Sequence, residues 1–289
     1  MQQRKFGKCR KLIVVGCLVQ RESNHLKELI PEIDVLLGVD DIPFIVSKAE
    51  LKPYQKSRHK GTEAQSVGAY PCVRPQKHKE ELLSRKKRME GEHRISQSPK
   101  WLYEGNPPRA LTGKLHYAFL KIADGCNHSC SFCIIPSIKG RYRSRSITSV
   151  VREAVGLAHS SVKELILISQ DTSFYGYDKG KPYYLVTLLK KLSRISHLKW
   201  LRLLYLYPDH VSDELIKIIA QEDKICKYFD IPFQHCSERI LKLMNRGGNK
   251  QRQIELIERI KHEIPAASIR TTLITGFPGE TEKEFEELL

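Results

Sequence analysis

The chain has 289 residues, which is enough for about two domains and a sizeable buried core. Hydrophobic residues make up 40% and charged residues 28%, which excludes disorder along the whole length, and no apolar run approaches the roughly 18 residues of a membrane span. Lys and Arg outnumber Asp and Glu by 49 to 33, and this net charge of +16 predicts attraction to polyanions such as RNA or a ribosome.

The first 50 residues have the pattern of an incomplete α/β layer. A short apolar strand at residues 12–15 is followed by a turn at Gly16, a helical stretch around residues 26–30 and a second apolar run at 35–37. The first apolar stretch has four residues against roughly 7 to 15 in a secretory signal, so a buried strand is favoured over a signal peptide. Because so few elements cannot close a core, we expect part of this domain to lie before Met1.

Residues 51–113 are predicted to be a basic linker or insertion. Within residues 52–100, 13 Lys or Arg stand against 5 acidic residues, and apolar residues follow no period. The run 80–94 has the charge order of a stabilised helix, and a solvated segment without structure is the equal alternative.

From residue 114 to 289, apolar strand-like runs alternate with amphipathic helical runs. The candidate strands are residues 117–122, 164–169, 200–205, 228–233 and 269–275. Ser212 is placed to cap one intervening helix, and Thr281 and Glu284 have the capping-box spacing that opens the last one. Strands separated by helices predict a parallel α/β sheet, and connections of this length suit a barrel. The chain ends within the last helix, so we also expect a portion beyond Leu289.

Three of the eight cysteines stand together directly after the first of these strands. Cys126, Cys130 and Cys133 have the spacing C-x3-C-x2-C. Such a loop can bind a four-iron cluster through three thiolates and leave one iron open to an outside ligand. The alternatives are a zinc site with His128 as fourth ligand, or three inert thiols. Single cysteines without a partner at ligand spacing are interpreted as thiols without a function, and they are Cys72, Cys226 and Cys236.

This loop, with Phe132 next to Cys133, resembles that of the radical S-adenosylmethionine (radical SAM) superfamily. The resemblance implies a partial (β/α)6 barrel with about five strands present. It implies that the open iron of a 4Fe–4S cluster chelates S-adenosylmethionine (SAM), and that an electron from a donor such as a flavodoxin then yields a 5′-deoxyadenosyl radical. Phe132 would contact the adenine.

Two more segments are similar to the methylthiotransferases within that superfamily. Residues 16–21 (GCLVQR) with 31–38 resemble the end of their N-terminal domain, and residues 276–281 (GFPGET) resemble their fifth-strand motif. In that family three N-terminal cysteines hold a second 4Fe–4S cluster, and the resemblance makes Cys17 the last of them. The other two would lie before Met1, and Cys9 is not at a ligand position. We therefore expect either a truncated start or a chain unable to insert sulfur; on the residues alone, Cys17 is a buried thiol.

The family modifies either a tRNA adenosine or an aspartate of a small-subunit ribosomal protein. The segments at residues 168–176 and 230–235 resemble the aspartate-modifying branch. The resemblance thus implies a cytoplasmic enzyme that adds a methylthio group to the β-carbon of that aspartate, using one SAM for the methyl group and another for the radical. The alternatives are a tRNA methylthiotransferase, a non-catalytic zinc-binding module on the ribosome, and a fragment that has lost sulfur insertion.

Polar side chains follow several of the candidate strands, where a parallel barrel carries its reactive groups. They are expected to bind SAM or the peptide, with the fixing of loops as the alternative. The candidates are Gln170, Asp171, Gln234, His235 and Arg270, the last as a partner of the SAM carboxylate.

Arginines occupy alternate positions after the cysteine loop, at residues 141, 143 and 145. Alternate residues of an extended segment share a face, so the three guanidinium groups are expected to point together at a carboxylate or phosphate. The alternative is that the three arginines lie on an edge exposed to solvent and bind no ligand.

Overall fold

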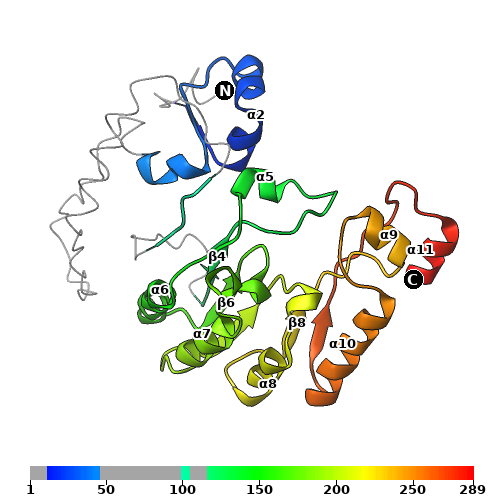
Figure 1. The fold of residues 1–289 in the computed structure, drawn as a ribbon. Helices are drawn as coiled ribbons and strands as arrows, with labels where there is room; N and C mark the ends of the chain where they lie inside the picture. The colour runs from blue at the N-terminus through cyan, green and yellow to red at the C-terminus, as the bar shows by residue number, and fades with distance from the viewer. Residues whose placement is uncertain (1–11, 46–98, 105–115) are drawn as a thin grey trace. The chain divides into compact units, whose positions relative to one another are not determined.

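The computed structural model describes residues 12–45, 99–104 and 116–289 (Figure 1). The chain divides into two compact units, residues 1–97 and 98–289. Most of the predicted basic linker lies outside the described residues, as do Cys9, Cys72 and the charged run 80–94.

The described part of the first unit is a β-α-β element. Strands β1 (Ile13–Val15) and β2 (Val35–Leu37) pair in parallel, with helix α2 (Cys17–Leu29) between them and a short 3-10 helix, η1 (Val39–Phe44), after them. Their core contains the buried Val19, Leu26 and Ile33. The predicted α/β layer is confirmed, but α2 begins at Cys17, well before the predicted helical stretch, because the helix follows the Gly16 turn directly.

The second unit is built on parallel strands. Strands β3 (Tyr117–Lys121), β6 (Glu164–Ile168) and β7 (Trp200–Leu203) form one sheet, and β8 (Tyr228–Asp230) pairs with β9 (Ser268–Arg270). A single parallel bridge between Leu201 and Ile225 connects β7 to the segment before β8. The predicted parallel α/β fold with five strands is therefore confirmed, although each strand is shorter than predicted. Two-residue strands β4 (Ala123–Asp124) and β5 (Arg143–Ser144) add an antiparallel pair that the sequence did not predict.

Long helices cover one face of these strands (Figure 1). The helices are α6 (Ile147–His159), α7 (Tyr184–Ser193), α8 (Asp213–Gln221) and α10 (Lys250–Glu263). Alternate strand residues such as Leu120, Leu167 and Leu203 are fully buried in this layer, whereas Phe119 on the other face of β3 is exposed. The single-sided covering follows from right-handed β-α-β crossovers, which keep the helices on one side of a closing sheet.

Shorter elements carry the loops between strands and helices. They are α5 (Ile135–Lys139), α9 (Glu238–Leu243), α11 (Glu282–Leu288), and the 3-10 helices η2 (Thr172–Phe174), η3 (Tyr177–Lys179) and η4 (Pro208–His210). The predicted caps are present: the Ser212 hydroxyl accepts from the Leu215 N–H at 3.2 Å, and the Thr281 N–H donates to Glu284 Oε2 at 3.0 Å. Within the described ranges, no helix combines the length and apolar character needed to cross a membrane.

Candidate functional site

The cysteine loop begins in a turn that only glycine fits. Gly125, directly after β4, has φ +82°, and a Cβ there would lie 2.2 Å from the Arg141 carbonyl oxygen. The close approach lets the Cys126 N–H donate to the Gly140 carbonyl at 3.1 Å, so the loop is closed at its base. This turn directs the chain across the C-terminal ends of the parallel strands, where Cys126, Cys130 and Cys133 follow.

All three cysteines of this loop are free thiols. Cys130 is buried, and Cys126 and Cys133 are partly buried. Burial raises the pKa of Cys126 by more than the hydrogen bond from the His128 N–H lowers it, and the negative charge of Asp171 also raises it. Such thiols release their protons when a positive ion binds them.

The donor set fits an iron–sulfur cluster better than zinc. A structural zinc site takes four protein ligands. A four-iron cluster binds three thiolates, each on a separate iron, and leaves the fourth iron open. His128, the predicted fourth zinc ligand, instead directs Nε2 at Asp171.

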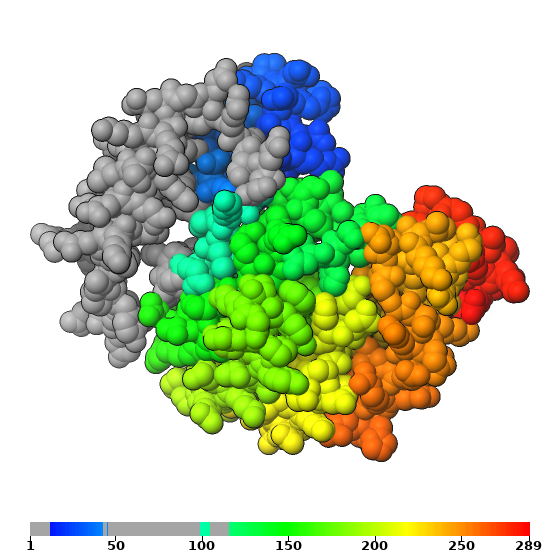
Figure 2. Space-filling view, viewed as in Figure 1, coloured from blue at the N-terminus to red at the C-terminus, as the bar shows by residue number. Residues whose placement is uncertain are grey.

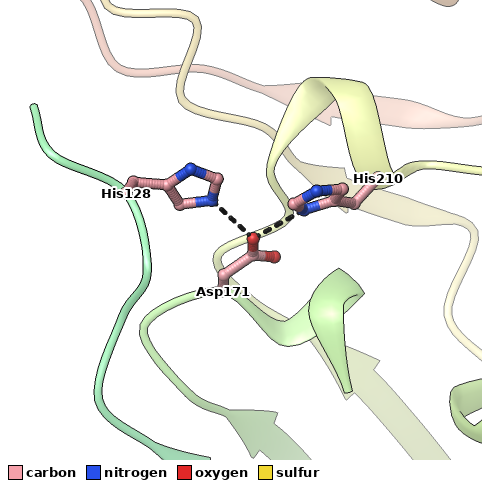
Figure 3. Close-up of side chains that lie close together, drawn as sticks. All are labelled: His128, Asp171 and His210. Atoms are coloured by element: carbon pink, nitrogen blue, oxygen red, sulfur yellow. Dashed lines mark hydrogen bonds and ion pairs between the residues drawn. The ribbon is translucent and has the colours of Figure 1, made fainter. Parts of the chain in front are cut away.

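A buried carboxylate next to the loop connects two histidines (Figure 3). Asp171, between β6 and η2, accepts through Oδ2 from His128 Nε2 at 2.9 Å and from His210 Nδ1 at 2.8 Å. Its Oδ1 accepts from the Ser173 hydroxyl at 2.7 Å. Burial raises the pKa of Asp171, but the hydrogen bonds from His128, His210 and Ser173 outweigh burial and lower the pKa to about 2. Asp171 is therefore ionised at neutral pH, and each facing ring nitrogen carries a proton.

Aromatic rings surround this carboxylate–histidine cluster. Tyr207 stacks on His128 with ring centres 3.8 Å apart and planes inclined by 11°. The Tyr142 hydroxyl donates to the backbone oxygen of Asp171 at 2.8 Å, and burial raises the pKa of Tyr142 well above its ordinary value. Tyr142 thus stays a neutral donor, and the two rings shield the cluster from water on these sides.

Three other predicted site residues lie in loops at the strand ends. Gln170 Oε1 is buried and has no hydrogen-bond partner in the described part of the chain, so it is an acceptor available to a ligand. Phe132 is 42% exposed. Gln234 has φ +74°, and its backbone bonds to Thr272 and Ile274 join the loops after β8 and β9.

His235 and Arg270 have partners within the chain. The His235 ring is fully buried; its Nδ1 accepts from the Ser237 N–H at 2.9 Å and its Nε2 lies 3.1 Å from Glu280 Oε1. This contact ties the loop after β8 to the GFPGET turn. Arg270 is more than half exposed and forms an ion pair of 3.5 Å with the buried Asp230. Binding of SAM by these residues stays a prediction.

Two predictions from the residues are wrong. The guanidinium groups of residues 141, 143 and 145 do not point together: Arg145 is fully buried against Glu153 at 2.7 Å, and Arg143 donates to the backbone oxygens of Lys139 and Arg141. Arg145 follows the short strand β5, and its ion pair with Glu153 on α6 holds its side chain in the core. Cys17 is exposed at the first position of α2 and is not a buried thiol.

The sequence reasoning missed His210, Tyr207 and Arg246. Tyr207 and His210 belong to the segment YPDH, which begins four residues after β7 ends, and a wider search at the end of this strand finds them. Arg246 lies in a turn after α9 and has no such signal.

Comparison with known proteins agrees with this site. The family described as the Radical SAM superfamily matches residues 120–289. The chain is 38% identical to ribosomal protein uS12 methylthiotransferase RimO of Koribacter versatilis, over 98% of this chain and 57% of that protein. It is 40% identical to the protein of the same name from Syntrophotalea carbinolica, over 100% and 56%. The chain thus spans about half the length of the curated relatives it matches.

A solved structure gives a weaker match. The radical S-adenosylmethionine methyltransferase TsrM from Kitasatospora setae, with tryptophan and a SAM analogue bound, is 19% identical over 60% of this chain and 33% of that chain, with a TM-score of 0.47.

Proposed function

Since this chain belongs to the radical SAM superfamily, we propose that it performs the radical chemistry of a methylthiotransferase whose substrate is an aspartate of ribosomal protein uS12. The observation that carries the proposal is the identity of about 40% along essentially the whole chain to proteins named uS12 methylthiotransferase. The cysteine loop supports it independently, because it holds three thiolates at the strand ends of an α/β fold.

Cys126, Cys130 and Cys133 would hold the 4Fe–4S cluster. When bound and reduced, the cluster supplies the single electron that cleaves SAM and so makes a carbon radical available at the strand ends. The tight turn at Gly125 closes the base of the loop that carries these three cysteines. Removal of a hydrogen atom by a radical needs no base, so we assign Asp171 and its two histidines a role in fixing the loops and not in proton transfer.

The remaining side chains of the site would bind SAM and the peptide. The Gln170 amide oxygen accepts a hydrogen bond from the ligand, since it has no partner in the described part of the chain. Phe132, exposed between two cluster ligands, covers the adenine. Gln234 and Arg270, from the loop after β8 and the end of β9, would contact the ligands, with Arg270 paired with a carboxylate. His235, whose ring is buried and bonded to Ser237 and Glu280, would act by holding the loop that carries Gln234. The rings of Tyr142 and Tyr207 keep water from the radical.

The sulfur step involves a second metal site. We propose that Cys17, exposed at the start of α2, is one ligand of a second 4Fe–4S cluster to which two further cysteines contribute. The substrate places the enzyme in the cytoplasm, where the net positive charge of the chain favours contact with ribosomal RNA and an electron donor such as a flavodoxin reduces the cluster.

Two measurements test the proposal. The anaerobically reconstituted chain, given SAM and a strong reductant, is expected to release 5′-deoxyadenosine, and Cys130→Ala is expected to release none. In a strain lacking the gene, mass spectrometry is expected to find uS12 without the methylthio group, and the full-length gene restores it. Equal release by wild type and Cys130→Ala would refute the radical chemistry, and loss of a methylthio group from tRNA with uS12 unchanged would assign a tRNA substrate.

A further inference from the structure

The turn that follows α9 holds the chain on both sides of Cys130. On one side, the Ser131 N–H donates to the Met244 carbonyl at 2.9 Å, and the Ser131 hydroxyl donates to the Leu243 carbonyl at 3.0 Å. On the other side, Asn245 Nδ2 donates to the Ser129 carbonyl at 2.9 Å. The gold segment around α9 accordingly lies beside the green cysteine loop in both views (Figures 1 and 2). Cys130 is therefore fixed by a part of the chain more than 100 residues away.

The backbone of this turn is strained at Asn245. Its φ of +50° lies in the left-handed region, which asparagine tolerates better than most residues. The preceding Met244 is fully buried, so the turn is anchored in the protein while Asn245 faces the loop. Strain of this kind persists where the surrounding contacts require it. Here the contacts that require it are the hydrogen bonds of residues 243–245 to Ser129 and Ser131.

The next residue of the turn directs a positive charge at the Cys130 sulfur. Arg246 Nη1 donates to Cys130 Sγ at 3.7 Å. The guanidinium group lies 4.5 Å from the centre of the Tyr207 ring, and its Nη2 donates to the Pro232 carbonyl. With three contacts from different loops, the group has little freedom to leave the sulfur. Cys126 Sγ differs, because its donor is the neutral backbone N–H of His128 at 3.4 Å.

We propose that Arg246 is a positioning residue that raises the reduction potential of the cluster through its charged hydrogen bond to Cys130. The inference rests on the proposed cluster. Reduction adds one electron, taken from an external one-electron donor, and breaks no bond in the protein. A cation beside a ligand sulfur stabilises the reduced form more than the oxidised form, because the reduced form has one more negative charge. Arg246 thus makes the cluster easier to reduce.

The test is a redox titration of the reconstituted full chain, followed by electron paramagnetic resonance in the presence of viologen mediators. The proteins are wild type, Arg246→Gln, Arg246→Lys and Arg259→Gln. Arg259 is a matched control because it is an arginine in an exposed ion pair with Asp213. Iron and sulfide are measured first, so that only loaded proteins are compared.

Arg246→Gln is expected to lower the ratio of reduced to oxidised cluster at a fixed potential by about tenfold, which for one electron equals a shift of about 59 mV to more negative potential. Arg246→Lys is expected to lie between this variant and wild type, since it keeps the charge but not the planar donor. Arg259→Gln is expected to match wild type.

A wild-type potential in loaded Arg246→Gln overturns the inference. If that variant cannot be loaded, Arg246→Met, which also removes the charge, is titrated in its place, and an unshifted potential there overturns the inference. A wild-type chain that binds no iron and sulfide overturns the proposed function together with this inference, so the two failures are distinguishable.

Discussion

His128 and Asp171 lie 2.9 Å apart, from Nε2 to Oδ2, although 43 positions separate them in the sequence. The contact joins the cysteine loop after β4 to the loop after β6. The same carboxylate oxygen accepts from His210, 39 positions further on, and so adds the loop after β7. One buried charge thus fixes three loops at the strand ends.

Asp171 is expected to make the protein less stable in acid. The pKa of Asp171 is near 3.8 in the unfolded protein and about 2 in the folded protein. The ionised side chain therefore adds about 2 kcal/mol to the free energy of unfolding. This contribution is nearly complete above about pH 4 and is lost as the pH falls toward 2. Between about pH 5 and pH 3, the free energy of unfolding in urea should fall by about 1 kcal/mol more in wild type than in Asp171→Asn. Parallel pH dependences of the two proteins would contradict this assignment.

The three loop cysteines are expected to be individually necessary for metal binding. Cys126→Ala, Cys130→Ala and Cys133→Ala should each reduce bound iron and sulfide to near background after anaerobic reconstitution, because a cluster with two protein ligands is released readily. Cys226→Ala, at another partly buried free thiol, should retain the wild-type content. Zinc without sulfide in the wild-type protein would reject the cluster.

Gly125→Ala is expected to disrupt the loop. The added methyl group would meet the Arg141 and Gly140 carbonyls at 2.2 and 2.6 Å, and φ of +82° is unfavourable for alanine. We expect a loss of more than about 2 kcal/mol in the free energy of unfolding together with loss of bound iron. Gly180→Ala is the control, because Gly180 also has positive φ but no atom within 4 Å; it should cost about 1 kcal/mol and retain the iron. Equal effects of the two substitutions would show that the close approach is unimportant.

The ion pair of Arg145 and Glu153 is expected to matter because it is buried. Arg145→Met should cost about 3–5 kcal/mol in unfolding free energy, since Glu153 then keeps a buried charge, and adding Glu153→Leu should recover part of this. The pair of Arg259 and Asp213 has the same N–O distance of 2.7 Å, but its side chains are 50% and 60% exposed. Arg259→Gln should therefore cost less than about 1 kcal/mol. Urea titrations of wild type and these three variants check both values, and a cost for Arg145→Met as small as that for Arg259→Gln would contradict the assignment.

Local patterns predicted the framework of the second unit. The five apolar runs became parallel strands and Ser212 caps α8, because strand period and capping depend on neighbouring residues. The two-residue strands β4 and β5 are too short to show a period. Arg145 was misplaced because its partner Glu153 belongs to another element, and alternation along a segment does not reveal which face will be buried.

The site was only partly predictable for the same reason. Cys126, Cys130 and Cys133 form a motif within eight residues, and their spacing indicates their chemistry. The partners of Asp171 depend on which loops the fold brings together. Asn245 lies 116 positions from Ser129, and Arg246 lies 116 positions from Cys130, and no spacing in the sequence indicates these two contacts.

The separation of 116 residues between Asn245 and Ser129 has a consequence for how the protein is made. The cysteine loop leaves the ribosome well before the turn that clamps it has been translated. The contacts of Ser129 and Ser131 with residues 243–245 can therefore form only after that later segment has been made, so the described geometry of the loop is completed late in synthesis.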